Sequence, residues 1–461
     1  MARTPSRQNP ARQKPARQKA SGPKPEVAGW RSRLAAAELV WGAAAKGVDL
    51  ETAMSASKAF RDLEGADRGF ARAMASAALR AMGRIDWALG GMVDRPLAEI
   101  EPPVLALLRV GAAQVWVLKV ADHAAVAATV EAALHWEGAR RGGGLINAVL
   151  RRATREATAF EAAPVEAVWP DWLAAKLKAA LGPEQARTLA RLQLEDPSVD
   201  LSVRNPAEAL EWAEKLEGVL LPNGSIRLSA SAGLANLPGY AEGAWWVQDV
   251  AASLAAPLLG NVSGLAVADL CAAPGGKAMQ LAARGARLSA VEISGQRMER
   301  LRENAARTGL AMELVQADAR TWRPHELVDA VLIDAPCSAL GVIRRHPEGI
   351  WRRDPKDLAR FPATQRALVD AAADMLKPGG RLIYAVCTPA PEEGRDVVEA
   401  AIRSGAWRRL PVTAEEAPGF AHALTAEGDL LTAPAPEQGP AETEAPQTRS
   451  DVFFIARLER T

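Results

Sequence analysis

The spacing of apolar residues predicts helices in the first third of the chain. One apolar stripe follows Pro102-Pro103 and repeats at i, i+3, i+4 and i+7; its members are Val104, Leu107, Leu108, Gly111, Val115 and Leu118. Similar stripes run through residues 31–45, 67–82 and 124–136. Because each stripe must be buried against a neighbouring helix, we predict an all-α domain over residues 29–160, with about five to seven helices.

The period of the pattern changes in the second half of the chain. Short apolar, β-branched runs alternate there with helical stretches; the runs are residues 265–270, 287–293, 312–318, 329–336 and 381–387. This alternation is typical of a doubly wound, mostly parallel sheet. We therefore predict a Rossmann-like α/β domain over residues 246–461. Residues 161–245 show helix patterns at 169–181 and from Pro183, and strand patterns after Val199, which predicts a small α/β connecting module.

Charge is distributed unevenly along the chain. The net charge is +1, but residues 1–25 carry seven Lys or Arg and no acid, so the remainder is near 1 − 7 = −6. The basic tail, residues 1–28, repeats ARQKP and ARQKA and cannot bury enough apolar surface to fold alone. An RNA-contacting arm, a solubilising leader and a transit peptide all fit it. The body must bind nucleic acid through local patches, and the candidates are the arginines of 140–155 and 344–353.

The cysteines and the hydropathy of the chain indicate the compartment in which the protein is expected. The chain has three cysteines, Cys271, Cys337 and Cys387, without CxxC spacing, which predicts neither a disulfide framework nor a metal site. Each cysteine taken alone would most simply be an inert buried thiol. No apolar run reaches about 18 residues and no secretory signal precedes the body. We expect a cytoplasmic protein with no membrane partner. The Pro/Ala/Glu-rich residues 432–449 are predicted to be a surface loop.

Acids and glycines follow three of the predicted strands. The first strand runs into Asp269 and the loop that ends in Gly275-Gly276-Lys277, where glycines allow a ligand to approach the backbone. This loop matches neither the dinucleotide-binding nor the P-loop motif. Glu292 ends the second strand and could bind both hydroxyls of a ribose, and Asp318, after the third, suits an adenine amino group. One such acid is often only a helix N-cap, but three in register predict a nucleoside cofactor.

The segment Val331–Arg353 combines the residue types that nucleobase chemistry needs. A buried strand ends at Asp334, and Cys337 follows on the loop beyond it. Ligands of open α/β sheets bind at such loops. A basic segment with Trp351 comes next. A thiol, an acid and a basic-aromatic arm together indicate chemistry on an RNA or DNA base.

Three long motifs carry a family resemblance. DLCAAPGGK, DAPCSALGVIRRHPEGIWRR and YAVCTPAPEEG resemble the bacterial RNA cytosine-C5 methyltransferases of the Sun family. The helical part, with LLRVGAAQVWVLKVADHAAVAATVEAAL and LINAVLRR, resembles the NusB family of RNA-binding domains. With both parts present, the chain is most similar to the small-subunit ribosomal RNA methyltransferase B subgroup. The resemblance implies S-adenosylmethionine as cofactor, held by Cys271, Ala272, Ala273, Pro274, Gly275, Gly276, Lys277, Glu292, Asp318 and Asp334.

The resemblance also assigns catalytic roles. It implies that Cys387 is the nucleophile that adds to C6 of cytosine, and that Cys337 assists release of the covalent adduct. Asp334 would hold the N3/N4 edge of the base, and Lys277 would orient that acid or the base. Cys271 is expected to pack beneath the cofactor loop. The chain departs from the family pattern at Ala278, Glu292, Val386, Thr388 and Gly394, none of which removes a sulfur or a carboxylate.

Other classes of protein fit the residues less well. A DNA cytosine methyltransferase would attack through a PCQ-type cysteine, but Ser338 follows Cys337 here. A protein or small-molecule methyltransferase would need neither thiol, and a binding-only antitermination factor would need no cofactor loop. Small-subunit (16S) ribosomal RNA is the expected substrate, transfer RNA is the alternative, and a monomer is expected.

Overall fold

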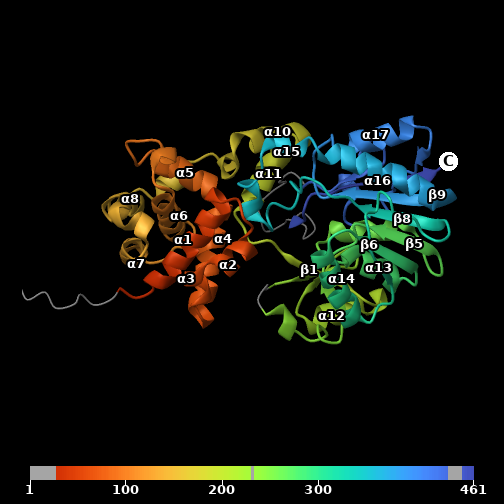
Figure 1. Cartoon of the computed structure of the whole chain (residues 1–461), viewed down its shortest axis with the longest axis horizontal. Helices are drawn as coiled ribbons and strands as arrows, with labels where there is room; N and C mark the ends of the chain where they lie inside the picture. The colour runs from red at the N-terminus through yellow and green to blue at the C-terminus, as the bar shows by residue number, and fades with distance from the viewer. Residues whose placement is uncertain (1–26, 230–232, 435–448) are drawn as a thin grey trace, which may run out of the picture.

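The computed structural model describes residues 27–229, 233–434 and 449–461. Almost all of the predicted basic tail and of the 432–449 insertion therefore lies outside the described residues. The described part is elongated, with a helical lobe at one end and an α/β lobe at the other (Figure 1). No helix in these ranges is both long enough and apolar enough to span a membrane.

The first lobe is all-α, as predicted. Its helices are α1 Trp30–Ala45, α2 Leu50–Ala56, α3 Lys58–Arg61, α4 Gly65–Arg80, α5 Met82–Gly90, α6 Pro102–Trp116, α7 Asp122–Leu134, α8 Gly143–Arg155 and α9 Thr158–Glu161. Residues 27–229 are described without a gap, so the predicted number of five to seven was too low. The reason is that α3 and α9 have four residues each, too few to show an apolar repeat.

The predicted apolar stripe of α6 lies at the centre of this lobe. Val104, Leu107 and Leu108 are buried, and Gly111 faces α8. A Cβ at Gly111 would lie 2.4 Å from Leu150 Cδ1, so the glycine is what lets the two helices approach. Only Leu118 of the stripe falls beyond the end of α6.

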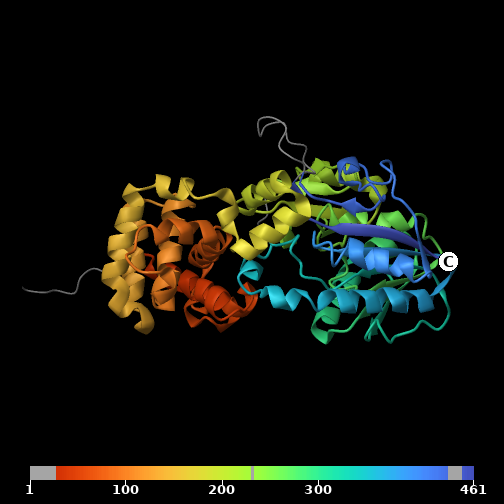
Figure 2. The same ribbon diagram turned by 90° about the horizontal axis from the view of Figure 1, so that it is seen from above.

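A middle region joins the two lobes. Helices α10 (Asp171–Leu181) and α11 (Pro183–Gln193) lie between the lobes; from above they are the yellow helices of Figure 2. A small antiparallel sheet follows in the order β2-β3-β1-β4, flanked by α12 (Ala209–Lys215). Its strands are β1 Val199–Val203, β2 Val219–Leu220, β3 Ile226–Leu228 and β4 Trp245–Val247.

The second lobe is built on an eight-stranded sheet. The strands are β5 Ala266–Leu270, β6 Arg287–Glu292, β7 Glu313–Gln316, β8 Val328–Asp334, β9 Leu376–Val386, β10 Trp407–Arg409, β11 Leu430–Leu431 and β12 Phe454–Arg460. The helices are α13 Gly276–Ala283, α14 Gly295–Thr308, α15 Pro355–Leu358, α16 Phe361–Met375 and α17 Arg395–Arg403. The order is β10-β12-β9-β8-β5-β6-β7, with β11 beside β12. Strands β7, β6, β5, β8 and β9 are parallel, which confirms the predicted doubly wound fold.

Both faces of this sheet are buried. Ala330 and Leu332 of β8 pack in the cluster that contains α13 and α14, while Val331 and Ile333 pack in the cluster that contains α16 and α17. This explains why the strand reads as an unbroken apolar run rather than as an alternating pattern.

The strand order shows which edge of the sheet is expected to bind a ligand. The chain runs from β5 outwards to β6 and β7, then returns to β8 on the other side of β5. The loops after β5 and β8 therefore diverge at a topological switch point, where open α/β sheets bind ligands. Strand β9 lies next to β8, so the loop after β9 meets the same edge.

Candidate active site

The loop between β5 and α13 has a conformation that only its glycines allow. Gly275 has φ 112°, and a Cβ there would lie 2.6 Å from Leu301 Cδ1. Helix α14 holds the loop from outside, because Arg297 Nη2 donates to Ala273 O at 2.5 Å and Asn304 Nδ2 donates to Pro274 O at 2.9 Å. The loop backbone is thereby fixed at the switch point, where a ligand can reach it.

Glu292 ends β6 beside this loop and is 1% exposed. Its Oε1 accepts a hydrogen bond from Ser294 N at 2.9 Å. Its Oε2 lies 3.1 Å from Arg297 Nη1 but accepts no hydrogen bond within the chain. A buried carboxylate oxygen with spare acceptor capacity fits a ligand hydroxyl, as the sequence predicted for the ribose.

A cavity of about 180 Å³ is lined by the residues on either side of Glu292 and by Asp318. Its lining is Cys271, Val291, Ile293, Ala317, Asp318, Ala319, Arg320, Pro336, Thr364 and Leu368. The walls are mainly apolar with one carboxylate, which fits an adenine ring with its amino group. Ile293, 61% exposed, also lines the cavity and was missed by the sequence analysis, although an exposed apolar residue directly after the strand-end acid was a usable signal.

Asp318 and Cys271 differ from what the sequence analysis expected of them. Asp318 accepts hydrogen bonds from Arg320 Nε at 3.0 Å and from Arg320 Nη2 at 2.6 Å, and these bonds lower the pKa of the carboxyl. An adenine amino group would therefore share Asp318 with Arg320. Cys271 forms part of the cavity wall, and burial raises the pKa of its thiol to about 12, so it stays protonated.

Asp269, beneath the loop, is one of the three acids from which the sequence predicted a nucleoside cofactor, but it lies within β5 and does not line the cavity. It is fully buried, and neither carboxylate oxygen has a hydrogen-bond partner. Burial raises its pKa well above the ordinary value, and the nearby Asp334 raises it further. Both effects favour the protonated, neutral form of the side chain.

Asp334 and Lys277 form an ion pair across the switch point. Asp334 ends β8, and Lys277 lies in the first turn of α13 with 7% of its side chain exposed. Lys277 Nζ donates to Asp334 Oδ2 at 2.7 Å. Burial is the largest single influence and lowers the pKa of Lys277, but the charge and the hydrogen bond of Asp334, with smaller contributions from other nearby groups, together raise the pKa, so the ammonium persists. Lys277 is thus placed to fix the orientation of Asp334.

The two cysteines with expected catalytic roles meet beside this ion pair. Cys337 Sγ and Cys387 Sγ lie 3.3 Å apart and share a hydrogen bond. That hydrogen bond and burial raise the pKa of Cys387 well above its ordinary value. These effects favour the protonated thiol of Cys387 over its thiolate.

The loops that carry the two sulfurs are fastened to each other. Ser338 Oγ donates to Thr388 Oγ1 at 3.0 Å, and Gly341 N donates to Cys387 O at 2.9 Å. Glu393, fully buried, accepts hydrogen bonds from Ser338 N at 2.8 Å and from Gln365 Nε2 at 3.1 Å. The sequence analysis missed Glu393 and Gln365, because nothing in the local pattern shows that they bridge two distant loops.

The prediction that Arg344 to Arg353 form an RNA-binding patch was wrong for Arg344 and Arg345. Arg344 is 1% exposed and donates to backbone carbonyls. Arg345 pairs with Asp249 at 2.6 Å and with Asp451 at 2.5 Å. The guanidinium groups of Arg344 and Arg345 are therefore already hydrogen-bonded or paired with acids from distant parts of the chain, and they are not available to phosphates.

The same segment fastens the catalytic lobe to the helical lobe. Arg80 of α4 donates to Arg344 O at 2.7 Å, and Trp351 Nε1 donates to Leu79 O at 3.3 Å. Arg352 Nε donates to Gly47 O at 2.7 Å. Arg353 differs from the others: its Nη1 is buried without a hydrogen-bond partner.

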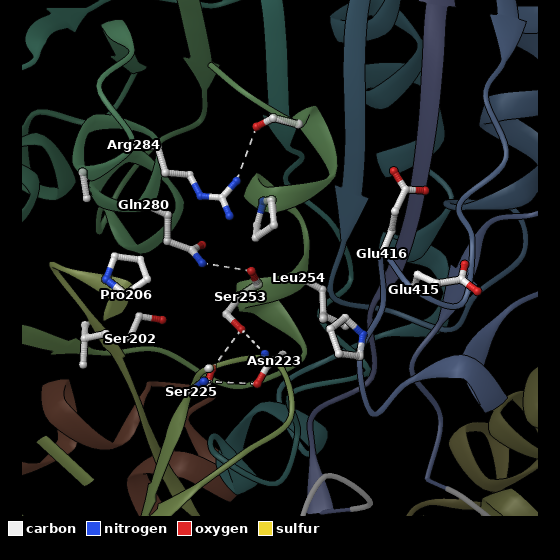
Figure 3. A pocket seen from close by; sticks show the side chains of 16 residues that line it. Ser202, Pro206, Asn223, Ser225, Ser253, Leu254, Gln280, Arg284, Glu415 and Glu416 are labelled. Carbon is white, nitrogen blue, oxygen red and sulfur yellow. Dashed lines mark hydrogen bonds between the residues drawn. The ribbon is translucent and has the colours of Figure 1, made fainter. Parts of the chain in front are cut away.

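A separate hollow of about 480 Å³ lies between the antiparallel sheet and the catalytic lobe (Figure 3). Its polar groups bond to one another: Asn223 Nδ2 donates to Ser253 Oγ at 2.9 Å, and Gln280 Nε2 donates to Ser253 O at 2.9 Å. None of the site residues predicted from the sequence lines it. Over the described ranges, no group of three or more His, Cys, Asp and Glu side chains is placed to hold a metal ion.

The switch-point loop, the strand-end acids and the cavity fit a nucleoside cofactor bound to a Rossmann-type fold, and S-adenosylmethionine-dependent methyltransferases are one class of enzyme with this arrangement. Comparison with known families agrees. Residues 257–459 match the model of the 16S rRNA methyltransferase RsmB/F family, and residues 31–155 match the NusB family.

Curated relatives identify the family of the whole chain. The chain is 35% identical over 424 residues to ribosomal RNA small subunit methyltransferase B of Xanthomonas campestris pv. campestris, covering 87% of this chain and 93% of the relative. It is 36% identical over 352 residues to the protein of that name from Sodalis glossinidius, covering 72% and 81%. The chain therefore belongs to the ribosomal RNA small subunit methyltransferase B family, as the sequence motifs predicted, and is an RNA methyltransferase.

Solved structures share the fold. The crystal structure of PH0851 has a TM-score of 0.72 at 22% identity and covers 93% of this chain and 98% of its own. The structure of NSun6 from Pyrococcus horikoshii with SFG has a TM-score of 0.52 at 19% identity and covers 63% of this chain and 98% of its own.

Proposed function

We propose that this methyltransferase modifies C5 of a cytosine in small-subunit (16S) ribosomal RNA through a covalent adduct between Cys387 and C6 of the base. The observation that carries the proposal is the pair of thiols, 3.3 Å apart, beside the Lys277–Asp334 ion pair. C5 of cytosine is a poor nucleophile until a thiolate adds at C6, so a methyltransferase that acts on this carbon needs a thiol in its active site.

Each residue has a distinct role in the proposed reaction. The Cys387 thiolate forms the S–C6 bond, and the π electrons of C5=C6 move towards C4 and N3. Asp334, oriented by Lys277, holds the N3/N4 edge where negative charge develops. S-adenosylmethionine, when bound, supplies the methyl group that C5 receives. Loss of the C5 proton then restores the double bond and expels the Cys387 thiolate, and Cys337 assists this release.

The cofactor would be held at the switch point. The loop from Cys271 to Gly276 would lie against its methionine part, Glu292 would bind the ribose hydroxyls, and Asp318 would bind the adenine amino group. The free Oε2 of Glu292 and the 180 Å³ cavity support this arrangement.

The substrate assignment rests on the family and on the helical lobe. The relatives are named for small-subunit ribosomal RNA, and the NusB-like lobe exposes arginines on and beside α8 that could contact phosphates. Stacked or paired cytosine hides its C6 face, so the target must be unpaired or flipped out. The proposed scheme assigns RNA choice to the helical lobe and base chemistry to the catalytic lobe.

The direct test is methylation of separated RNAs. Purified protein with labelled S-adenosylmethionine should label small-subunit ribosomal RNA, and bisulfite sequencing of that RNA should show one or a few new 5-methylcytosines. Labelling of transfer RNA instead would show that transfer RNA is the substrate. Labelled bases other than 5-methylcytosine would contradict methylation at C5 of cytosine.

A further inference from the structure

The two thiols of the candidate active site are close enough to bond to each other. Cys337 Sγ and Cys387 Sγ lie 3.3 Å apart, and both residues are partly exposed to solvent. A disulfide joins its sulfurs at about 2.05 Å, so these two atoms need to approach each other by only about 1.3 Å. Small rotations of the two side chains can supply a movement of this size.

The backbone beside each cysteine holds the two residues together. Strands β8 and β9, which end shortly before Cys337 and Cys387, are parallel neighbours. Beyond the strands, Gly341 N donates to Cys387 O at 2.9 Å. Ser338 Oγ also donates to Thr388 Oγ1 at 3.0 Å. Neighbouring strands lie about 4.8 Å apart, within the separation of about 4.4–6.8 Å that disulfides bridge between Cα atoms, so the fold itself suits a bond here.

The third cysteine has a different setting. Cys271 lies in the wall of the cofactor cavity, which neither Cys337 nor Cys387 lines. Burial raises the pKa of the Cys271 thiol to about 12, so this thiol stays protonated and unreactive. A bond between Cys337 and Cys387 would therefore leave the cofactor cavity intact while it removes both thiols that the proposed reaction uses.

We propose that Cys337 and Cys387 form a reversible disulfide when the protein meets hydrogen peroxide, and that this bond switches methyl transfer off. One sulfur, as its thiolate, attacks the O–O bond of the peroxide and becomes a sulfenic acid, and hydroxide leaves. The second thiolate attacks the sulfenic sulfur, the S–S bond forms, and a second hydroxide leaves. The two thiol protons convert both hydroxides to water. The sulfurs lose two electrons in total, and the peroxide oxygens gain them.

The two steps differ in speed, and the difference protects the site. The hydrogen bond with Cys337 and burial raise the pKa of Cys387, so little of its thiolate is available and the first step is slow. The second step is fast because the other sulfur is already 3.3 Å away. The sulfenic acid is thus captured before more peroxide converts it to a sulfinic acid, which ordinary thiols do not reduce.

The direct test follows the bond, the activity and cofactor binding in one series of samples. Full-length wild type is treated with graded hydrogen peroxide, and mass spectrometry of the alkylated, digested protein should find Cys337 linked to Cys387 and Cys271 free. Methyl transfer to small-subunit ribosomal RNA should fall in proportion to the linked fraction and return fully with dithiothreitol. The affinity for S-adenosylmethionine, measured by calorimetry, should not change.

Variants with one cysteine replaced supply controls that need no activity. In Cys337→Ala and in Cys387→Ala, the remaining thiol of the pair should accumulate a sulfenic acid that dimedone labels, followed by a sulfinic acid. The wild type should show little of either, because its sulfenic acid is captured by the second sulfur. Cys271→Ala should form the same linked peptide as the wild type.

Each contrary outcome has its own meaning. Sulfinic acid in the wild type to the same extent as in the single variants, without a linked peptide, would overturn the disulfide. Linked protein that still transfers methyl groups, or that has lost its affinity for S-adenosylmethionine, would overturn the switch. The switch rests on the proposed function, whereas formation of the bond does not. Reduced wild type that makes no 5-methylcytosine would contradict the proposed function, and the linked peptide would still decide whether the bond forms.

Discussion

Cys337 Sγ and Cys387 Sγ lie 3.3 Å apart although 50 residues separate them in the sequence. Strands β8 and β9 are parallel neighbours, so the loops beyond their carboxyl ends begin side by side. Ser338, Thr388 and Glu393 then join the two loops through hydrogen bonds. The short distance between the two sulfurs therefore follows from the strand order, because β8 and β9 are neighbours in the sheet.

The pair should control the reactivity of Cys387. Its hydrogen bond with Cys337 and its burial raise the pKa of Cys387, so little thiolate exists near pH 7 and iodoacetamide should alkylate this residue slowly. Cys337→Ala removes the first of these causes and lowers the pKa, so alkylation at pH 8 should become faster. Mass spectrometry of the Cys387 peptide over a pH series measures this. Cys271 serves as the internal control, since its pKa of about 12 should keep it unreactive in both proteins.

Glu292 should contribute directly to cofactor affinity. Glu292→Ala should weaken S-adenosylmethionine binding by about 1–3 kcal/mol, because a charge-assisted hydrogen bond to the ribose is lost. Isothermal titration calorimetry measures the change. Glu292→Gln keeps the size of the side chain and isolates the effect of charge. Unchanged affinity in the alanine variant would remove Glu292 from the cofactor site.

The ion pairs of Arg345 should support folding rather than RNA binding. Arg345→Met leaves the buried Asp249 and Asp451 without their counter-ion, and breaking such a pair costs about 3–5 kcal/mol. Thermal unfolding should show a large fall in melting temperature. A matched change at an exposed pair, Arg408→Met opposite Glu459, should cost less than about 1 kcal/mol. Comparable effects at the two sites would contradict the structural role of Arg345.

The arginines on and beside α8 should set the affinity for RNA. Arg141, Arg151 and Arg155 are exposed, and replacing all three with alanine should weaken binding and reduce the salt dependence by about 0.7–0.9 in log–log slope for each lost phosphate contact. Filter binding at several salt concentrations measures the slope. The charge-matched control is a triple alanine variant of exposed arginines of the catalytic lobe, namely Arg302, Arg395 and Arg408. An unchanged slope in the variant of Arg141, Arg151 and Arg155 would mean that this surface does not contact phosphates.

Much of the architecture could be predicted because periodicity reports which faces are buried. The apolar run before Asp334 became β8, a strand with both faces buried. Of the three acids predicted to lie in register, Glu292 ends β6 and Asp318 follows β7 at the same edge of the sheet, but Asp269 is buried within β5. Strand β9 was predicted from Arg381 but begins at Leu376, because Pro378-Gly379-Gly380 reads as a turn. In the structure that stretch lies within the strand, where the register against β8 shifts between Val328 and Ala330.

What could not be predicted depends on partners far away in the sequence. Arg345 looks like an RNA ligand until Asp249 and Asp451, 96 and 106 residues distant, are seen beside it. Glu393 looks like a surface acid until its bond to Ser338 N, across 55 residues, is known. Local sequence shows which side chains can carry a charge, but only the fold shows whether that charge is already neutralised.

The account depends most on the division of labour between the two thiols. If Cys387 adds to C6 and Cys337 assists release, Cys337→Ala should form the adduct and fail to resolve it. Incubated with small-subunit ribosomal RNA and S-adenosylmethionine, this variant should run on a denaturing gel as a nuclease-sensitive RNA–protein species. Cys387→Ala should form no such species and no 5-methylcytosine. Accumulation of the adduct by Cys387→Ala, with none from Cys337→Ala, would contradict the account and reverse the two roles.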